Sequence, residues 1–293
     1  MSTAPFISVI IPHYRDLRAL DLCLEALGRQ TYPAADFEII VADNNSPEGE
    51  AAVAAVIAGR ARLTVVHEKG AGPARNGGVV LAQGEILAFT DSDCVPEPEW
   101  LVEGLAALST CDFIGGRVTV LVANVLKMSG AEAFERVFAF DFETYITKKG
   151  FTGAGNLFCA RRVFDQVGGF RVGLSEDLEW SRRATAKGFR LGYAPGAVVG
   201  HPARRNWEEL WGKWRRVNAE TYGLYRERRG GDLKWLIRSF ALPLSALFHA
   251  PKVLVSDQLL TGEQRVAAIQ TLFKLRFWRF GHALDLLRKK MGR

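Results

Sequence analysis

The sequence predicts an α/β protein in which a sheet carries helices on both faces, followed by a helical and basic C-terminal extension. Short apolar strands without polar alternation recur up to residue 200. Segments with apolar residues at helical spacing separate them, which is typical of a sheet covered on both sides. From Asn206 onward the strand pattern disappears, and Trp, Tyr, Lys and Arg accumulate. We therefore expect two domains, residues 1–205 and residues 206–293.

The first hundred residues predict four strands, each followed by a helix. Strands are expected at residues 6–12, 37–42, 63–67 and 86–90, and helices at 18–30, 50–58, 74–83 and 98–108. Such alternation predicts parallel strands. In parallel sheets ligands bind beyond the carboxyl ends of the strands, which is where polar and acidic residues gather in this sequence.

The remaining sequence predicts a less regular middle part and a helical tail. Strands are expected at residues 114–122, 157–160, 190–193 and 197–200, and helices at 131–145, 162–167 and 175–187. A glycine turn at 151–156 precedes one of these strands. Residues 263–290 have apolar side chains three or four positions apart among many basic ones, which indicates an amphipathic helix.

Composition and charge narrow the class of protein. Apolar residues make up 48% and charged residues 24%, which excludes a disordered chain. The net charge of +6 is unevenly distributed. Residues 1–203 hold 19 Lys and Arg against 24 Asp and Glu, a net charge of −5, whereas residues 204–293 hold 19 against 8, a net charge of +11. This asymmetry indicates two functional regions, and an anionic partner for the basic one.

Cysteine usage and hydropathy indicate a cytoplasmic chain. The four cysteines are scattered without a CxxC pair, as expected of reduced thiols. The N-terminus lacks the basic segment of a signal peptide. The uncharged apolar stretch of the tail, residues 239–251, is shorter than the roughly 20 residues of a spanning helix. We therefore expect no transmembrane helix.

Two carboxylates follow the predicted strand 86–90. Asp91 and Asp93 are two residues apart, so both can face one ligand once the chain leaves the strand. Carboxylate oxygens suit Mg²⁺ or Mn²⁺, cations often shared with phosphates. The alternative is a pair of helix-capping residues. His201, at the end of the last predicted strand, is either a third metal ligand, a phosphate donor or a structural histidine.

Three further positions carry candidate chemistry. Asp43 follows strand 37–42 and either accepts a hydrogen bond from a base or ribose, or forms an Asx-turn with its own loop. Arg75 lies in a glycine-rich loop that opens a helix, a suitable place for phosphate or ribose contacts. Glu176 and Asp177 open another helix, where either one acts as a general base or both favour the positive end of the helix dipole.

In their order along the chain, these segments resemble the family 2 glycosyltransferases of the GT-A fold. The resemblance covers residues 5–205 and is carried by residues 8–12 with Tyr14, 40–46, 72–76, 89–93, 153–156 and 176–180, and by His201. It implies a Rossmann-like mixed sheet. It also implies an inverting transfer of a sugar from a nucleotide-diphosphate donor to a hydroxyl acceptor, with a divalent cation, Mg²⁺ or Mn²⁺, as cofactor.

The resemblance also implies a role for each matching residue. Asp93 would coordinate the cation with help from His201, and Asp91 would lie against the ribose or the metal. Asp177 would deprotonate the acceptor hydroxyl, and Glu176 would assist it or bind the acceptor. The implied nucleotide-sugar site comprises Pro12, Tyr14, Asp43, Arg75, Asp91, Gly155 and Asn156.

The sequence departs from the family pattern in places. Tyr14 precedes Arg15, where the family usually has Tyr-Asn. The QxxRW pattern of processive members is matched only loosely within residues 206–216, which favours transfer of a single sugar. We expect a role in cell-surface polysaccharide or glycolipid synthesis, with an acceptor that can be lipid-linked. The rival functions are a catalytically silent nucleotide-sugar-binding or scaffold protein, and a nucleotidyltransferase, which would show a basic glycine-rich signature after the first strand.

The basic tail allows three interpretations. A basic amphipathic helix with Trp and Phe suits an anionic membrane surface, which would place the protein peripherally on the inner face of the cell membrane. Alternatively, its apolar stripe packs on the catalytic domain and leaves Lys and Arg in solvent. Nucleic-acid binding is disfavoured, because the sequence contains no nucleic-acid-binding module.

Overall fold

The computed structural model describes residues 4–172, 175–227 and 229–291. The chain forms two compact units. The first consists of Met1–Thr119, Phe140–Val172 and Glu176–His201, and the second of Val120–Ala139, Gly173–Ser175 and Pro202–Arg293. The functional boundary at residue 205 remains a prediction, and each unit is described by itself below.

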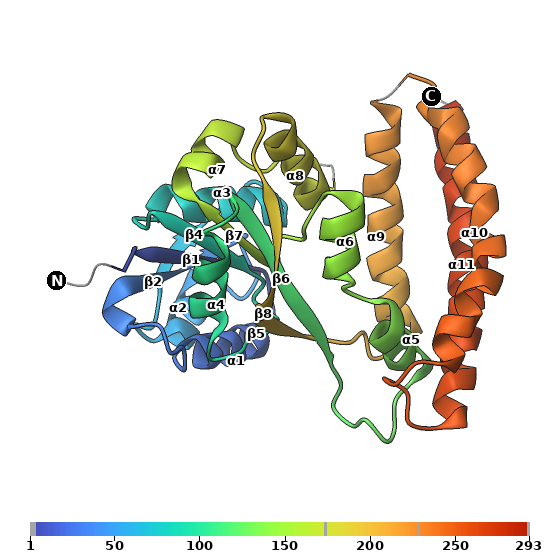
Figure 1. The fold of residues 1–293 in the computed structure, drawn as a ribbon, viewed down its shortest axis with the longest axis horizontal. Helices are drawn as coiled ribbons and strands as arrows, with labels where there is room; N and C mark the ends of the chain where they lie inside the picture. Colours follow the sequence, from blue (N-terminus) through green and yellow to red (C-terminus); the bar gives the residue numbers. More distant parts are fainter. Residues whose placement is uncertain (1–3, 173–174, 228, 292–293) are drawn as a thin grey trace. The chain divides into compact units, whose positions relative to one another are not determined.

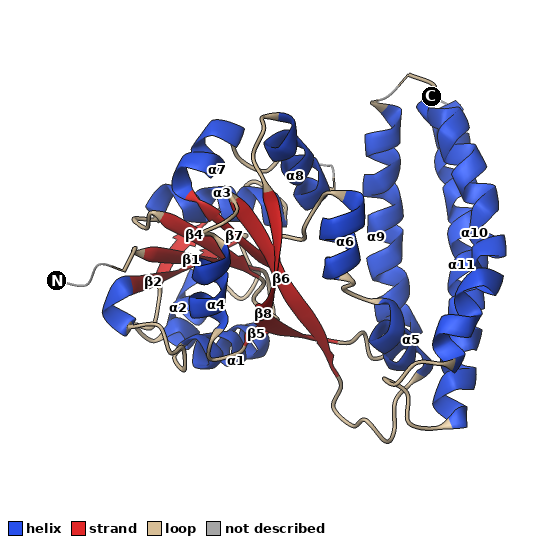
Figure 2. Cartoon of the chain, in the orientation of Figure 1, coloured by secondary structure: helices blue, strands red, loops and turns tan. Residues whose placement is uncertain are grey.

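The first unit is built on a mixed eight-stranded sheet with the order β3-β2-β1-β4-β7-β6-β8-β5 (Figure 2). Strands β3, β2, β1 and β4 are parallel, whereas β7 is antiparallel to β4 and to β6, and β5 is antiparallel to β8. The parallel half carries the strand ends at which a nucleotide is expected. The strands are β1 (Ile7–His13), β2 (Phe37–Asp43), β3 (Arg62–Val65), β4 (Ile86–Thr90), β5 (Val95–Pro96), β6 (Phe113–Leu121), β7 (Asn156–Ala160) and β8 (Leu191–Pro202).

Helices cover both faces of this sheet, as predicted (Figure 1). On one face α1 (Leu17–Leu27), α2 (Glu50–Ile57) and α4 (Trp100–Ala107) pack against strand residues that include Val9 and Ile11. On the other, α3 (Ala71–Leu81), α7 (Arg161–Val167) and α8 (Glu176–Ala186) pack against residues that include Ile10. Successive residues of β1 are therefore buried on opposite faces, which explains why the strand is apolar without alternation.

Two segments of the middle part differ from the predictions. The single helix predicted over residues 131–145 is two helices, α5 (Gly130–Phe138) and α6 (Phe142–Lys149). The chain breaks at Phe140, whose φ of 55° is left-handed, and Asp141 then caps α6 by accepting from the Thr144 N–H. The two short strands predicted at 190–193 and 197–200 are one continuous strand, β8.

The second unit is helical, as predicted for the tail. It contains α5, α9 (Trp207–Arg226), α10 (Gly231–Leu254) and α11 (Gly262–Met291). Leu210, Leu272 and Leu275 are fully buried in its core. Part of the apolar stripe of α11, including Leu272, thus packs within its own unit, whereas Val266 and Phe277 are exposed. Among the described residues, no helix is both long enough and apolar enough to cross a membrane.

Candidate active site

The site residues of the first unit gather where β1, β2 and β4 end. The parallel register places His13 of β1 beside Asp43 of β2, and both are the last residues of their strands. Asp91 follows directly after the last residue of β4. The sheet therefore brings together polar residues that lie far apart in the sequence.

A buried arginine joins two of the predicted carboxylates. Arg75, in the first part of α3, donates from Nη2 to Asp91 Oδ1 and from Nη1 to Glu176 Oε1, each at 2.5 Å. Its side chain is 5% exposed, and its guanidinium carbon lies 5.7 Å from the centre of the Phe170 ring. The guanidinium thus holds the start of α8 next to the end of β4.

Burial and charge compete within this network. Burial alone would lower the pKa of Arg75, but the carboxylates of Asp91 and Glu176 outweigh it and raise that pKa, so the arginine stays charged. Burial raises the pKa of Glu176 and outweighs the opposing effect of Arg75, while Asp177 and Asp91 raise it further. Glu176 therefore binds a proton more readily than an exposed glutamate does.

Two glycines leave room for the carboxylates of Asp91 and Glu176 to lie against the neighbouring backbone. A Cβ atom at Gly155 would lie 2.8 Å from Asp91 Oδ2, and one at Gly72 would lie 2.6 Å from Glu176 Oε2. Both distances are shorter than side chains tolerate. Gly155, predicted to shape the donor-sugar site, therefore packs directly against Asp91.

Asp177 lies in the first turn of α8, together with Glu176 and Glu179. The Leu178 N–H donates to Asp177 Oδ1 at 2.7 Å. N–H groups at a helix start lack partners within the helix and favour a negative charge. Asp177 is half-buried, so the helix start stabilises its carboxylate and leaves part of it accessible.

A second cluster contains two of the predicted metal ligands and one residue that the sequence did not indicate. Donor atoms of Asp93, Cys94 and His201 all lie within 4.8 Å of one another. His201 Nε2 is 3.4 Å from Asp93 Oδ2, and the Phe140 ring packs against the imidazole with 4.5 Å between ring centres. Asp91, also predicted as a metal ligand, is not part of this cluster and pairs with Arg75.

Asp43 forms the loop bonds expected of an Asx-turn. Its Oδ2 accepts from the Ser46 N–H at 2.9 Å, and its Oδ1 accepts from the Ser46 hydroxyl at 2.5 Å. The Ser46 Oγ also accepts from the N–H of Arg15, whose φ is 74°. The loops after β1 and β2 are thereby joined. Contact between Asp43 and a base remains a prediction.

The other two residues predicted after β1 differ in exposure. Pro12 is buried within the strand, whereas Tyr14 is 49% exposed. The Arg15 guanidinium lies 5.0 Å from the centre of the Tyr14 ring. An exposed aromatic ring at the end of β1 is available to a ligand.

Asn156 has a structural role in the sheet. Its Oδ1 accepts from Trp100 Nε1 at 2.9 Å, and its Nδ2 donates to the carbonyls of Arg117 and Ala197. The side chain is fully buried, so this structure offers no contact between it and a sugar. What Asn156 contributes is the fixed start of β7, directly after Gly155.

Sequence reasoning missed His13, Cys94 and Phe140 as neighbours of the site. His13 is 1% exposed, and within the described residues neither of its ring nitrogens has a hydrogen-bond partner. Burial lowers its pKa and outweighs the effect of nearby acidic groups, chiefly Asp43, so the ring is neutral. Its position after an apolar strand was the only signal available.

A sheet whose parallel strands end in gathered polar and acidic side chains is a typical frame for an enzyme active site. Residues 8–179 match the family described as "Glycosyl transferase family 2". That match covers more than half of the chain, which therefore belongs to glycosyl transferase family 2 and is a glycosyl transfer enzyme.

Individual relatives agree with this assignment. The chain is 35% identical over 211 residues to "Glycosyltransferase AglE" of Haloferax volcanii, covering 69% of each chain. It is 34% identical over 92 residues to "Poly(ribitol-phosphate) beta-glucosyltransferase" of Bacillus spizizenii, covering 30% of this chain and only 14% of that protein.

A solved structure shares the GT-A fold. The mannosyltransferase PcManGT of Pyrobaculum calidifontis, in complex with GDP-Man and Mn²⁺, superimposes with a TM-score of 0.56. The match has 18% sequence identity and covers 99% of this chain and 76% of that one.

Proposed function

We propose that the chain transfers a single sugar, with inversion, from a nucleotide-diphosphate donor to a hydroxyl acceptor in cell-surface polysaccharide or glycolipid synthesis. The observation that carries the proposal is the network in which Arg75 joins Asp91 to the start of α8. It brings a candidate base, Asp177, and the carboxylates after β4 to one end of the sheet.

The donor set at the end of β8 fits a divalent cation. Asp93 offers carboxylate oxygen and His201 an imidazole nitrogen, ligands that suit Mn²⁺ and, through the oxygen, Mg²⁺. We propose these two residues as ligands, with Asp91 nearby. When bound, the cation would neutralise charge on the diphosphate and stabilise its departure. The Mn²⁺ and GDP-Man bound to the structural neighbour support this assignment.

Direct displacement needs one base close to the acceptor hydroxyl. We assign that role to Asp177, because the start of α8 stabilises its charge and the side chain remains partly accessible. As the new glycosidic bond forms, the proton of the hydroxyl passes to Asp177 and the bond to the diphosphate breaks. Glu176 is paired with Arg75 and acts by positioning this turn or by contacting the acceptor.

The end of the parallel strands is the proposed place of the nucleotide. Tyr14 offers an exposed ring, and the loop tied together by Asp43 is joined to the loop that follows Tyr14 through Ser46. Pro12 is buried in β1, Arg75 fixes Asp91, and Gly155 keeps the chain close to Asp91.

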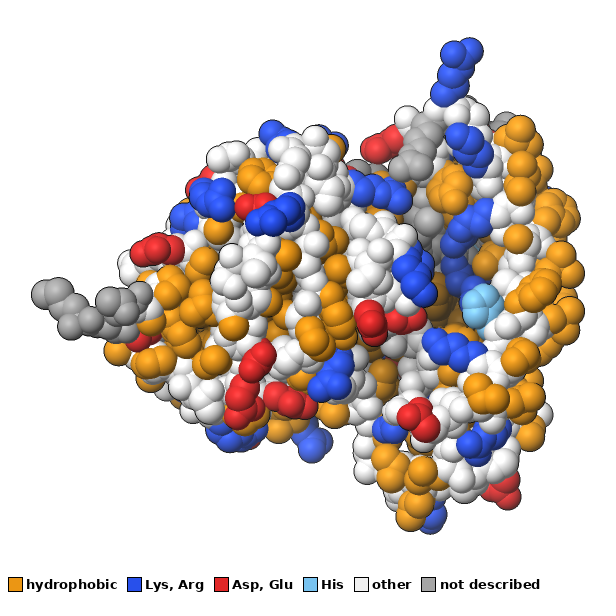
Figure 3. Space-filling view, viewed as in Figure 1, with side chains coloured by type: hydrophobic (Ala, Val, Ile, Leu, Met, Phe, Trp, Pro, Cys, Tyr) orange, Lys and Arg blue, Asp and Glu red, His pale blue; other side chains and the backbone are white. Residues whose placement is uncertain are grey.

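An apolar face on α10 supports peripheral contact with a membrane. Exposed apolar side chains recur three or four positions apart, so they form one stripe. Figure 3 shows hydrophobic side chains along the margin of α10 and α11. The tail carries a net charge of +11, which complements the anionic inner leaflet. The stripe consists of Leu233, Ile237, Phe240, Leu244, Leu247 and Phe248.

A donor panel tests the proposal. Purified protein is incubated with UDP-, GDP- and dTDP-sugars and Mn²⁺ or Mg²⁺, and nucleotide release and the anomeric configuration of the product are followed by NMR. We expect turnover with inversion, and its loss in Asp177→Asn with donor binding retained. Asp165→Asn, on the exposed side of α7, is the matched control and should be fully active.

The same panel separates the alternatives. Donor binding without turnover in the unsubstituted protein, with lipid-linked and soluble acceptors supplied, would establish the scaffold function. Retained configuration in the product would overturn the assignment of Asp177 as the base of a direct displacement.

A further inference from the structure

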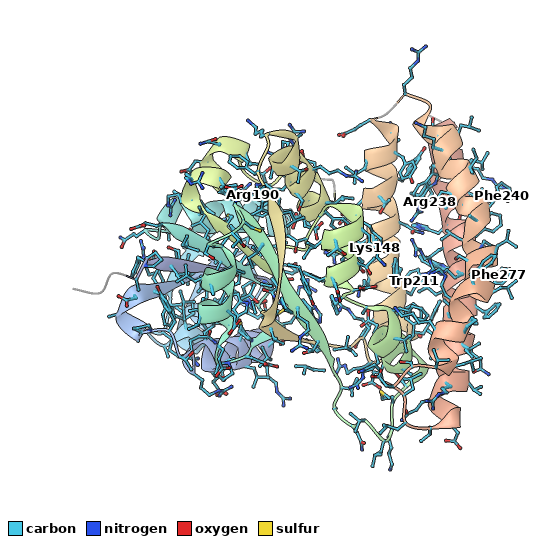
Figure 4. All side chains as sticks on the ribbon, in the orientation of Figure 1. Lys148, Arg190, Trp211, Arg238, Phe240 and Phe277 are labelled. Carbon is cyan, nitrogen blue, oxygen red and sulfur yellow. The ribbon has the colours of Figure 1, made fainter. Side chains whose placement is uncertain are left out.

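Three arginines are grouped inside the helical second unit. Arg238 lies on α10, and Arg276 and Arg279 lie one turn apart on α11. Arg279 is 3% exposed, whereas Arg238 and Arg276 are half-buried. Figure 4 shows Arg238 on the side of α10 that faces α9, opposite to Phe240 and Phe277. The helices thus turn some basic side chains inward, which differs from the interpretation of the tail in which Lys and Arg are left in solvent.

Two of the three guanidinium groups rest on aromatic rings, and none of the three has an acidic partner among the described residues. The guanidinium carbon of Arg279 lies 4.0 Å from the centre of the Trp214 ring, and that of Arg238 lies 5.0 Å from the centre of the Trp235 ring. Arg279 Nε donates to Asn218 Oδ1 at 3.0 Å. Within the described residues, no carboxylate forms an ion pair with any of the three arginines.

Some of the donor groups have no partner at all. Within the described residues, Arg238 Nη1 and Arg276 Nε are buried and form no hydrogen bond. Buried N–H groups of charged side chains are normally bonded, because leaving them unpaired is unfavourable. These atoms therefore represent unused binding capacity for an acceptor with several oxygens.

Repulsion among the three positive charges makes the burial of these arginines still more unfavourable. Burial lowers the pKa of Arg279, and the charges of Arg238 and Arg276 lower it further. Burial also lowers the pKa of Arg276, with a further contribution from Arg238. Elsewhere in the same unit a buried cation is neutralised, since Lys213 Nζ lies 2.6 Å from Glu135 Oε1. The unit thus pairs one buried cation with a carboxylate and leaves three together without one.

We propose that Arg238, Arg276 and Arg279 form a binding site for a phosphate or diphosphate group. A guanidinium presents a planar fork of donors that matches phosphate oxygens, and stacking on Trp214 and Trp235 fixes two forks without neutralising them. The partial exposure of Arg238 and Arg276 gives the anion access. The site lies in the second unit and contains none of the residues assigned to sugar transfer.

The same chemistry has two sources, a lipid headgroup and a soluble phosphate. The full chain is therefore titrated in two arms, with inorganic phosphate and pyrophosphate by thermal shift and calorimetry, and with vesicles of phosphatidylcholine with or without phosphatidic acid by co-sedimentation. Binding in the first arm identifies a site that takes soluble phosphates. Binding only to vesicles with phosphatidic acid identifies a headgroup site.

The matched variants are R238Q/R276Q and, as control, R288Q on the exposed side of α11. We expect R238Q/R276Q to weaken binding in the responding arm by about tenfold or more, and R288Q to change it by less than about threefold. Without ligand, R238Q/R276Q should melt no lower than the unsubstituted protein, because repulsion among buried charges is relieved.

Two results would overturn the proposal. One is an absence of binding in both arms. The other is a variant R238Q/R276Q that binds as tightly as the unsubstituted protein, because the arginines would then have only a structural role in the second unit. Neither arm uses a sugar donor, so the outcome is independent of the proposed transfer reaction.

Discussion

Replacing Arg75 by Gln should leave two close carboxylates without their shared counter-charge. In the structure Arg75 is the group that donates to both Asp91 and Glu176. The glutamine is shorter and neutral, so it cannot bridge them. Glu176 is then held in a buried position with its charge uncompensated.

The expected loss of stability follows from burial. Removing one partner of a buried ion pair typically destabilises a protein by about 3–5 kcal/mol. The side chain of Asp91 is 33% exposed and that of Glu176 is 22% exposed, so solvent screens part of the effect and we expect about 3 kcal/mol at pH 8. The matched control is Arg62→Gln, which should cost less than about 1 kcal/mol, because Arg62 is 44% exposed and Glu38 keeps hydrogen bonds from Ser8 and Gln83.

The effect should depend on pH in a defined direction. The pKa of Glu176 is already raised in the folded protein, and loss of Arg75, which lowers it, raises it further. A carboxyl with a raised folded-state pKa favours folding at low pH, and this contribution is lost as the pH rises through that pKa. The loss of stability in Arg75→Gln should therefore be largest at pH 8 and shrink towards pH 5. The difference should be about 1.4 kcal/mol for each unit by which the substitution raises the pKa of Glu176.

Urea unfolding at pH 5, 6.5 and 8 measures these differences directly. Equal losses at pH 5 and pH 8 would refute the reasoning, because they would show that the carboxylates are not the cause. The reasoning would also be refuted if the Arg75→Gln variant were as stable at pH 8 as the unsubstituted protein.

Three further predictions concern the site and the tail. Gly155→Ala should lower kcat by about tenfold or more, because its Cβ would displace Asp91; unchanged kinetics would contradict this. His201→Gln should raise the Mn²⁺ concentration for half-maximal activity by about tenfold or more, and an unchanged titration curve would remove it as a ligand. Phe240→Ser with Phe248→Ser should release the folded protein from anionic vesicles, since both rings are exposed; equal sedimentation would exclude this face.

The sheet and its covering helices could be predicted because local sequence determines them. The apolar strand at 86–90 and the helix at 50–58 need only the pattern of their own residues. The break between α5 and α6 could not be predicted. The residues around Phe140 include no Pro or Gly that would indicate a left-handed backbone, and the packing of the Phe140 ring on His201 is a contact between residues far apart in the sequence.

The sequence could predict those residues of the candidate site that directly follow a predicted strand or open a predicted helix. Asp91, Asp93 and Asp177 were indicated by position and residue type. Their partners were not, because the bridge from Arg75 to Glu176 spans 101 residues and depends on how α3 and α8 pack on the sheet. Cys94, next to Asp93, was passed over because a lone cysteine carries no spacing signal.

The uneven charge along the chain has different physical meanings in its two regions. At the site the cation Arg75 is compensated by two carboxylates, which fixes the geometry around a surface that remains acidic. In the tail, cations lie on aromatic rings, as Lys274 does 4.1 Å from the centre of the Trp207 ring. A ring holds a cation in place without cancelling its charge. The tail therefore keeps the positive field that an anionic ligand requires. Lys and Arg side chains paired with carboxylates would not provide this field, because their charges would be cancelled.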